Sequence, residues 1–140
     1  MEAVTVVGLA ASIIQLIDTT AKAIKYINDV KDAPTERARL AREATSLLAL
    51  LTDLRYRVEE TTSTDPWFTG IRSLGVEGGP MEQFNRAMED LTSKLRPGKS
   101  LKKFSKAVFW TLEKNEINNT LTQIERLKSF VNLALQMDHL

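Results

Sequence analysis

The chain has no cysteine among its 140 residues, and its only histidine is His139. Without cysteine there is no disulfide, no thiolate metal ligand and no thiol nucleophile, and this composition favours a reducing compartment. A serine or threonine nucleophile would lack its ordinary histidine base, and a Glu-x-x-His metal site cannot form. The acidic residues are mostly spaced to pair with basic ones on a helix, as Asp53 is with Arg57, which indicates a solvated face. We therefore expect a protein that is not an enzyme and that has no cofactor and no bound metal.

An excess of either charge is also missing, because 19 basic residues face 18 acidic ones and the formal net charge is +1. Such a balance gives no overall attraction to nucleic acid, and no recognition motif for it is present. Four prolines and six glycines are too few for a low-complexity or collagen-like chain. We expect one domain over residues 1–140, large enough to bury a core, and no nucleic-acid partner.

Residues 3–17 contain no charge, although 26% of the whole chain is charged. Fifteen helical residues cover only about 22 Å of a hydrocarbon core of roughly 30 Å. Glu2 stands where a secretory signal has basic residues, so the segment is a poor export signal. Two interpretations remain: a helix buried in the core, or a helix that can leave the core for a membrane. If the seven large aliphatic side chains of residues 4–16 were all buried, their release would cost on the order of 10 kcal/mol or more.

The spacing of apolar residues predicts four long helices, at about residues 4–30, 35–60, 80–95 and 112–137. The second is the clearest, because its apolar positions alternate in steps of four and three. These positions are Leu40, Ala44, Leu47, Leu51, Leu54 and Val58. A helical turn near Trp67 and an amphipathic segment at 101–109 complete the pattern, and no run alternates with a period of two. The sequence therefore predicts an all-α fold without a sheet: a helical bundle of four long helices with one or two short extra helices.

No acidic residue lies between Asp90 and Glu113, and this window is rich in basic and aromatic side chains. Its basic residues are Lys94, Arg96, Lys99, Lys102, Lys103 and Lys106. A basic amphipathic segment that ends in aromatic residues can bind an anionic lipid surface. The alternative is a solvated lysine face that neighbouring acidic residues balance.

Four segments together resemble a known family. They are the apolar opening at residues 3–16, the stretch Tyr-Ile-Asn-Asp-Val-Lys-Asp-Ala-Pro at 26–34, the pair Phe109-Trp110, and the ending at 124–138. They resemble the fungal HeLo-like N-terminal domains of NOD-like receptors and related STAND proteins. That resemblance implies a bundle similar to HeLo and to the four-helix domain of the animal necroptosis executioner. It also implies a role in programmed cell death during heterokaryon incompatibility or defence.

In that family the N-terminal hydrophobic helix is thought to reach the membrane after a receptor or amyloid signal oligomerises the protein. Carried onto residues 3–17, the resemblance implies a membrane-contacting set of Val4, Val7, Gly8, Leu9, Ser12, Ile13 and Leu16. The expected partners are anionic membrane lipid and either a second copy or a NOD-like receptor or amyloid signalling partner. The expected location is the cytoplasm, with relocation to the plasma membrane on activation. Because no nucleotide-binding module or amyloid motif is present, we expect an excised domain or a short homologue.

Two other functions remain open from the residues alone. The chain could be a protein–protein adaptor or oligomerisation module without membrane activity, using the seam of the second helix or the two-sided apolar end of the last. It could also be a structural cap for a larger receptor.

Overall fold

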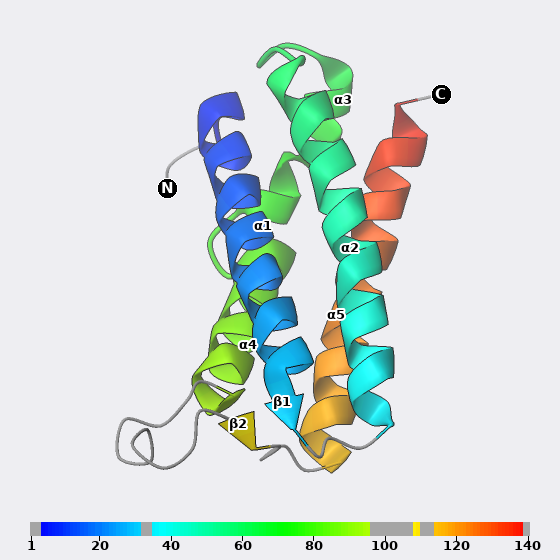
Figure 1. Cartoon of the computed structure of the whole chain (residues 1–140). Helices are drawn as coiled ribbons and strands as arrows, with labels where there is room; N and C mark the ends of the chain where they lie inside the picture. Colours follow the sequence, from blue (N-terminus) through cyan, green and yellow to red (C-terminus); the bar gives the residue numbers. More distant parts are fainter. Residues whose placement is uncertain (1–3, 32–34, 96–107, 110–113, 139–140) are drawn as a thin grey trace.

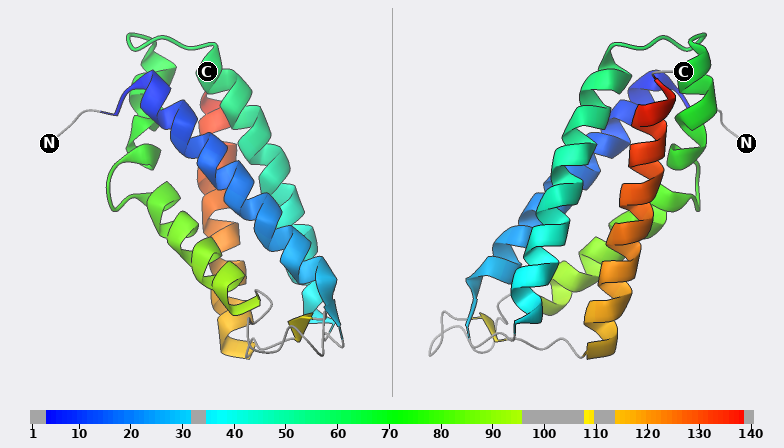
Figure 2. Two further views of the ribbon diagram at one scale, coloured as in Figure 1. Left: turned by 60° about the vertical axis from the view of Figure 1, so that its left-hand side comes forward. Right: turned by 90° about the vertical axis from the view of Figure 1, so that its right-hand side faces the viewer.

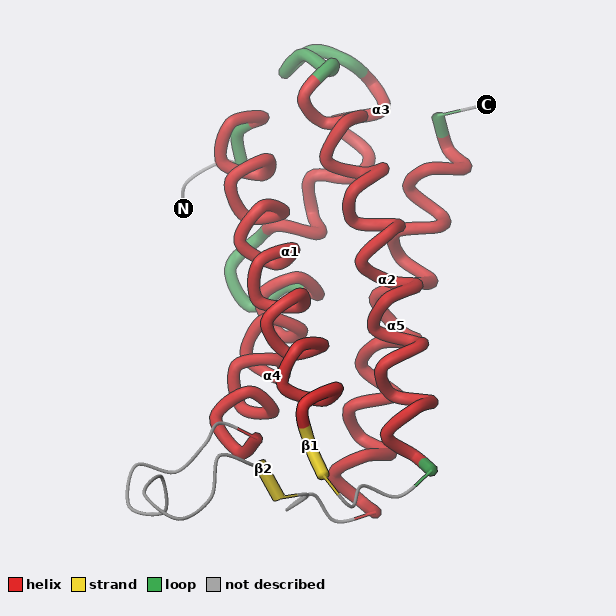
Figure 3. Tube along the Cα trace, in the orientation of Figure 1, coloured by secondary structure: helices red, strands yellow, loops and turns green. Residues whose placement is uncertain are grey.

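The computed structural model describes residues 4–31, 35–95, 108–109 and 114–138, and it is helical over most of these ranges. The α-helices are α1 (Val6–Asp29), α2 (Glu36–Glu59), α3 (Pro66–Ile71), α4 (Pro80–Leu95) and α5 (Lys114–Met137). A 3₁₀-helix, η1 (Arg72–Gly75), links α3 to α4, and two short strands are β1 (Val30–Lys31) and β2 (Val108–Phe109). Figure 3 shows how helix dominates the trace. The expected all-α helical bundle is confirmed at this level.

The helices α1, α2, α5 and α4 occupy the four corners of the bundle (Figures 1 and 2). Helices α1 and α5 each pack against both α2 and α4, so α1 and α5 lie at diagonally opposite corners. Helix α4 has only 16 residues, and α3 and η1 extend its corner. Helix α1 begins and α5 finishes at the same end, which we call the upper end because it is uppermost in Figure 1.

The seam predicted for α2 is confirmed in full, since all six of its apolar positions are completely buried. In α5, Leu127 and Lys128 are neighbours in the sequence but lie in different environments. Leu127 is buried, whereas the ammonium of Lys128 donates a hydrogen bond to Glu43 Oε1 of α2 at 3.2 Å. The steps of four and three therefore place a continuous apolar stripe against the neighbouring helices.

The expectation that the chain contains no sheet is wrong at one place. Strands β1 and β2 pair in parallel, with Val30 opposite Val108 and Lys31 opposite Phe109. A strand of two residues is too short to show an alternation of polar and apolar side chains in the sequence. The backbone hydrogen bonds that pair β1 with β2 do not depend on such an alternation. The segment predicted as amphipathic at 101–109 is therefore extended at 108–109, and its residues 101–107 lie outside the described residues.

Candidate functional site

The N-terminal half of α1 has an exposed face without charge. This α1 outer face consists of Val7, Gly8, Ala11 and Ile14. Val7 is 79% exposed, Gly8 and Ala11 are also exposed, and Ile14 is half-buried. The first charged residue along the same side of the helix is Asp18, which is exposed. Water therefore contacts about three turns of helix that carry only small, aliphatic or uncharged polar side chains.

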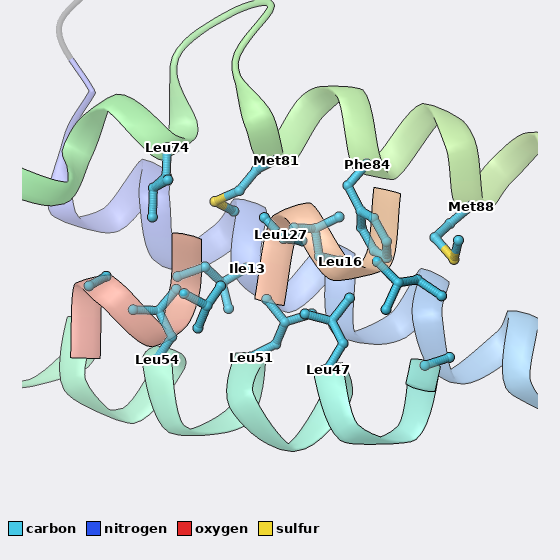
Figure 4. Close-up of a cluster of buried hydrophobic side chains, with 14 of the residues drawn as sticks. Ile13, Leu16, Leu47, Leu51, Leu54, Leu74, Met81, Phe84, Met88 and Leu127 are labelled. Carbon is cyan, nitrogen blue, oxygen red and sulfur yellow. The ribbon is translucent and has the colours of Figure 1, made fainter. Parts of the chain in front are cut away.

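The opposite side of the same turns belongs to the core. Leu9, Ile13 and Leu16 are at most 2% exposed. Figure 4 shows Ile13 and Leu16 in the buried cluster, where side chains of η1, α4, α2 and α5 converge. Removing these three side chains from the core would cost about 5–9 kcal/mol. That is less than the cost expected if all seven aliphatic residues were buried, but it is still comparable to the stability of a domain.

The residues proposed from the sequence as a membrane-contacting set therefore occupy three environments. Val7 and Gly8 are exposed, and Val4 and Ser12 are half-buried. Leu9, Ile13 and Leu16 are buried. While the bundle is intact, only the first two groups are accessible to a lipid surface. The buried group could reach lipid only after α1 had left the core.

Two residues fix the position of the start of α1. The Oγ1 atom of Thr5 accepts a hydrogen bond from the Gly8 amide at 2.9 Å, which caps the first turn. The last residue of η1, Gly75, lies directly against this end of the helix. A Cβ atom added to Gly75 would lie 2.7 Å from Leu9 Cδ1 and 3.6 Å from Val4 Cγ1. Glycine at position 75 thus allows a close approach that any larger residue would disturb.

Helix α1 is long and apolar enough to cross a membrane by length and composition, and 28% of its most apolar 18-residue window is buried. Its 24 residues extend about 36 Å, which exceeds the 22 Å of the uncharged run. The extra length includes Asp18 and Lys22, which a spanning helix would have to carry into the hydrocarbon. In burial and composition, α1 is therefore intermediate between a core helix, which is mostly buried, and a typical membrane-spanning helix.

Of the predicted basic lipid-facing residues, the structure describes only Lys94, at the end of α4. Its ammonium forms ion pairs with Glu116 and with Asp90, the latter at 3.4 Å, and the hydrogen bond to Glu116 raises the pKa of Lys94. The other five, Arg96, Lys99, Lys102, Lys103 and Lys106, lie outside the described residues. Because α4 finishes at the lower end of the bundle (Figure 1), Lys94 and Val7 lie toward opposite ends. A flat membrane could reach both only if the bundle axis lay along its surface.

A second feature of the upper end is a clasp around Arg57 of α2. One guanidinium nitrogen of Arg57 lies 2.8 Å from Asp138 and 3.3 Å from Asp65, and the guanidinium carbon lies 4.2 Å from the Trp67 ring centroid. The hydrogen bond with Asp138 raises the pKa of Arg57. Asp65 also caps α3, because it accepts the Trp67 amide. The clasp joins the ends of α2, α3 and α5.

The Trp67 indole strengthens this junction, since its Nε1–H donates a 2.7 Å hydrogen bond to the carbonyl of Ala134 in the last turn of α5. Carbonyl groups in the last turn of a helix have no hydrogen-bond donor within that helix. The Trp67 indole therefore supplies a donor that the Ala134 carbonyl would otherwise lack. The expected pairing of Arg57 with Asp53 is wrong, because Arg57 bonds to Asp65 and Asp138 instead. Local spacing in the sequence cannot reveal a pair that is formed only when α2 and α5 meet.

Two large apolar side chains of α5 are also exposed: Phe130 at 38% and Leu133 at 57%. Phe130 lines a hollow of about 270 Å³ between α4 and α5, together with Pro80, Gln83, Gln123, Arg126 and Leu127. This volume is below the roughly 300–1,000 Å³ of most ligand pockets. The exposed apolar residues of α5 thus belong to an open surface rather than to an enclosed small-molecule site.

Among the described residues, no three histidine, aspartate or glutamate side chains are grouped so that they could hold a metal ion. No family model matches the chain, and no curated protein or solved structure matches it either. The α1 outer face, the Arg57 clasp and the apolar residues of α5 are therefore the features from which a function can be argued.

Proposed function

We propose that this protein is a membrane-targeting effector or signalling domain of a fungal cell-death or incompatibility system, and that it acts through the N-terminal half of α1. The observation that carries the proposal is the α1 outer face, on which Val7 is 79% exposed and no described residue before Asp18 is charged. A surface helix of a soluble bundle normally has polar or charged residues on its outer side. The second half of α1 follows that rule with Lys22 and Lys25, and the first half does not.

The energetics favour contact with lipid by the intact bundle before any release of α1. Transfer of Leu9, Ile13 and Leu16 from the core to lipid gains nothing, because lipid tails are about as apolar as the core. Extraction of α1 would also leave the side chains that pack against it on α2 and α4 in water. In contrast, Val7 gains free energy as soon as it leaves water, roughly 1.5–3 kcal/mol for full burial. We therefore propose that the α1 outer face binds the membrane first, and that any deeper insertion requires oligomerisation to cover the vacated core.

In this proposal the protein resides in the cytoplasm and moves to the plasma membrane after self-association, or after a NOD-like receptor or amyloid signal brings copies together. One apolar contact per copy is too weak to hold a protein on lipid, as a single acyl chain already gives only marginal binding. Several copies in one assembly would multiply the contact through effective concentration. Oligomerisation would thus act as the switch.

The test compares Val7→Glu with Tyr56→Glu in vesicle co-sedimentation and dye-leakage assays. Tyr56 is the matched control because it is a large side chain with 62% exposure and belongs to α2 rather than to the α1 outer face. We expect the wild type and Tyr56→Glu to bind and permeabilise anionic vesicles, and Val7→Glu to lose most of both activities. Both positions are exposed, so both variants should fold, which thermal unfolding checks. Equal activity of Val7→Glu and the wild type would rule out the proposed contact.

The same pair of variants tests the cell-death role when the chain is expressed in a filamentous fungus. We expect the wild type and Tyr56→Glu to reduce viability, and Val7→Glu to be tolerated at the same protein level. Loss of viability with Val7→Glu would separate toxicity from the α1 outer face.

The second candidate function is a protein–protein adaptor or oligomerisation module that never contacts lipid. The exposure of Phe130 and Leu133 on α5 favours it, because side chains of this kind often mark protein interfaces. Self-association in solution without any vesicle binding would support this function over the first.

A further inference from the structure

Two exposed apolar surfaces lie on opposite sides of the bundle. One is the α1 outer face, with Val7 and Ala11 at its centre. The other is a line of residues on α5, Arg126, Phe130 and Leu133, which we call the α5 ridge. Steps of four and three residues place the members of the ridge on one side of the helix. Because α1 and α5 occupy diagonally opposite corners, the two surfaces face away from each other.

The two helices have the same length and opposite directions. Each has 24 residues, and α1 begins where α5 finishes, at the upper end of the bundle (Figure 1). Counted from that end, Asp18 is residue 13 of α1 and Arg126 is residue 12 of α5. At about 1.5 Å per residue, the two charges therefore lie at nearly the same height. On both helices the exposed apolar residues lie above them, toward the upper end.

The two charged side chains are also in a position to form an ion pair with another molecule. Asp18 and Arg126 are exposed, and neither has an ion-pair partner among the residues that the structure describes. A second copy shifted sideways in the same orientation would bring its α5 ridge against the α1 outer face of the first. Phe130 and Leu133 would then meet Val7, Gly8 and Ala11, and Arg126 would meet Asp18. The small residues of α1 leave room for the large residues of α5, and the charge pair lies at the rim, as in other protein interfaces.

We propose that copies of this chain associate head to tail, with the α1 outer face of one copy packed against the α5 ridge of the next. The contact is heterologous, because it joins two different surfaces. Each copy in a pair therefore retains one unused surface, and the assembly continues into a ring or a filament. This inference does not depend on the membrane function. Because lipid and a second copy compete for the α1 outer face, this head-to-tail assembly is a form in which that face is covered. It is distinct from the clustering that the proposed function places on the membrane, in which the α1 outer faces contact lipid. The α5 ridge serves self-association alone.

The decisive experiment mixes two variants of the full chain in sedimentation velocity. Val7→Glu removes the α1 outer face, and Leu133→Glu removes the α5 ridge; both positions are exposed. We expect the wild type and the Tyr56→Glu control to form larger species as concentration rises, and each of the two variants alone to be a monomer. An equimolar mixture should form dimers and nothing larger, since only one intact contact can form between the two variants.

Other results would overturn the proposal. Self-association of Leu133→Glu alone would indicate a symmetric contact between α1 faces, and self-association of Val7→Glu alone would indicate one between α5 ridges. A mixture that remains monomeric, or a wild type that remains monomeric up to about 1 mM, would show that the surfaces do not bind each other. Vesicle binding by Leu133→Glu reports separately on the membrane proposal, so the two proposals can fail independently.

The charge pair gives an independent check. Asp18→Arg and Arg126→Asp should each raise the dissociation constant at least about tenfold by placing like charges together. The double variant, in which the charges are exchanged, should recover most of the wild-type affinity. If the double variant is as weak as the sum of the two single changes, Asp18 and Arg126 do not meet and the proposed register is wrong.

Discussion

Replacement of Gly75 by alanine gives the sharpest test of how the start of α1 is held. The new Cβ would lie 2.7 Å from Leu9 Cδ1, closer than carbon atoms approach in folded proteins. Leu9 is only 1% exposed, so it has little room to move aside. Overpacking of this kind costs typically 1–3 kcal/mol, and we expect Gly75→Ala to lower the free energy of unfolding by about that amount. Among the described glycines, Gly78 has a positive φ and Gly75 does not. Alanine can therefore adopt the backbone conformation of position 75 without strain, and the clash with Leu9 is the effect that the substitution measures.

A second glycine supplies the matched control with the opposite sign. Gly70 is exposed on α3, and a Cβ there would lie 3.1 Å from the terminal methyl group of Met137, which can swing away. Alanine is better than glycine in a helix by roughly 0.5–1 kcal/mol. Urea denaturation should therefore show that Gly70→Ala is neutral or stabilising, whereas Gly75→Ala destabilises the same chain.

A double-mutant cycle with Leu9 identifies the contact. Leu9→Ala alone should cost about 2–5 kcal/mol, because it empties a buried position. In the Gly75→Ala background the added methyl group partly fills that space, so the double variant should be more stable than the sum of the single effects by over about 0.5 kcal/mol. Amides at positions 9–13 should also exchange faster in Gly75→Ala than in the wild type. An unchanged unfolding free energy, or strict additivity, would show that the η1 turn does not hold α1.

Three further predictions follow from individual contacts. Thr20 is fully buried and its Oγ1 has no hydrogen-bond partner in the part of the chain that the structure describes, so Thr20→Val should raise the unfolding free energy by about 1–3 kcal/mol in thermal or urea denaturation. Trp67→Phe should lower it by about 1–3 kcal/mol and speed amide exchange at the end of α5, because the buried Ala134 carbonyl loses its donor. Hydrogen bonds from the Thr61 hydroxyl and the Trp67 amide lower the pKa of Asp65, so its stabilising effect is complete above its ordinary pKa of 3.8 and is lost as pH falls through the lower folded value. Stability should therefore decline below about pH 4 in the wild type and decline less in Asp65→Asn, whereas equal pH profiles would exclude this role.

The sequence was sufficient for the features that depend on local periodicity. The six core positions of α2 follow from steps of four and three residues, and α4 begins at the residue predicted from Pro80. Helix α1 was harder, because its first half is apolar on every side and periodicity cannot choose a buried face. Leu9 and Ile13 are buried and Val7 is exposed because α2, α4 and η1 cover only one side, which is a property of the bundle.

Contacts between distant segments were not predictable from one sequence. The Arg57 clasp needs Asp138, the residue that follows α5, beside the end of α2, and the i,i+4 spacing pointed to Asp53 instead. The parallel pairing of Val30 with Val108 joins two segments with no strand-like pattern. The sequence placed the candidate site in the N-terminal half of α1, and its role there stays a prediction. The division of that half into an exposed face and a buried face became visible only once the neighbouring helices were placed.

The central claim is that the α1 outer face meets lipid while the bundle remains folded. Because the chain has no cysteine, a single cysteine at position 7, 11 or 56 can carry an environment-sensitive fluorophore. On addition of anionic vesicles to the folded protein, we predict a blue shift and quenching by lipid-borne quenchers for labels at positions 7 and 11, and neither change for the label at position 56. If vesicles bind the protein while the label at position 7 remains in water, or if position 56 enters lipid equally, the claim is contradicted.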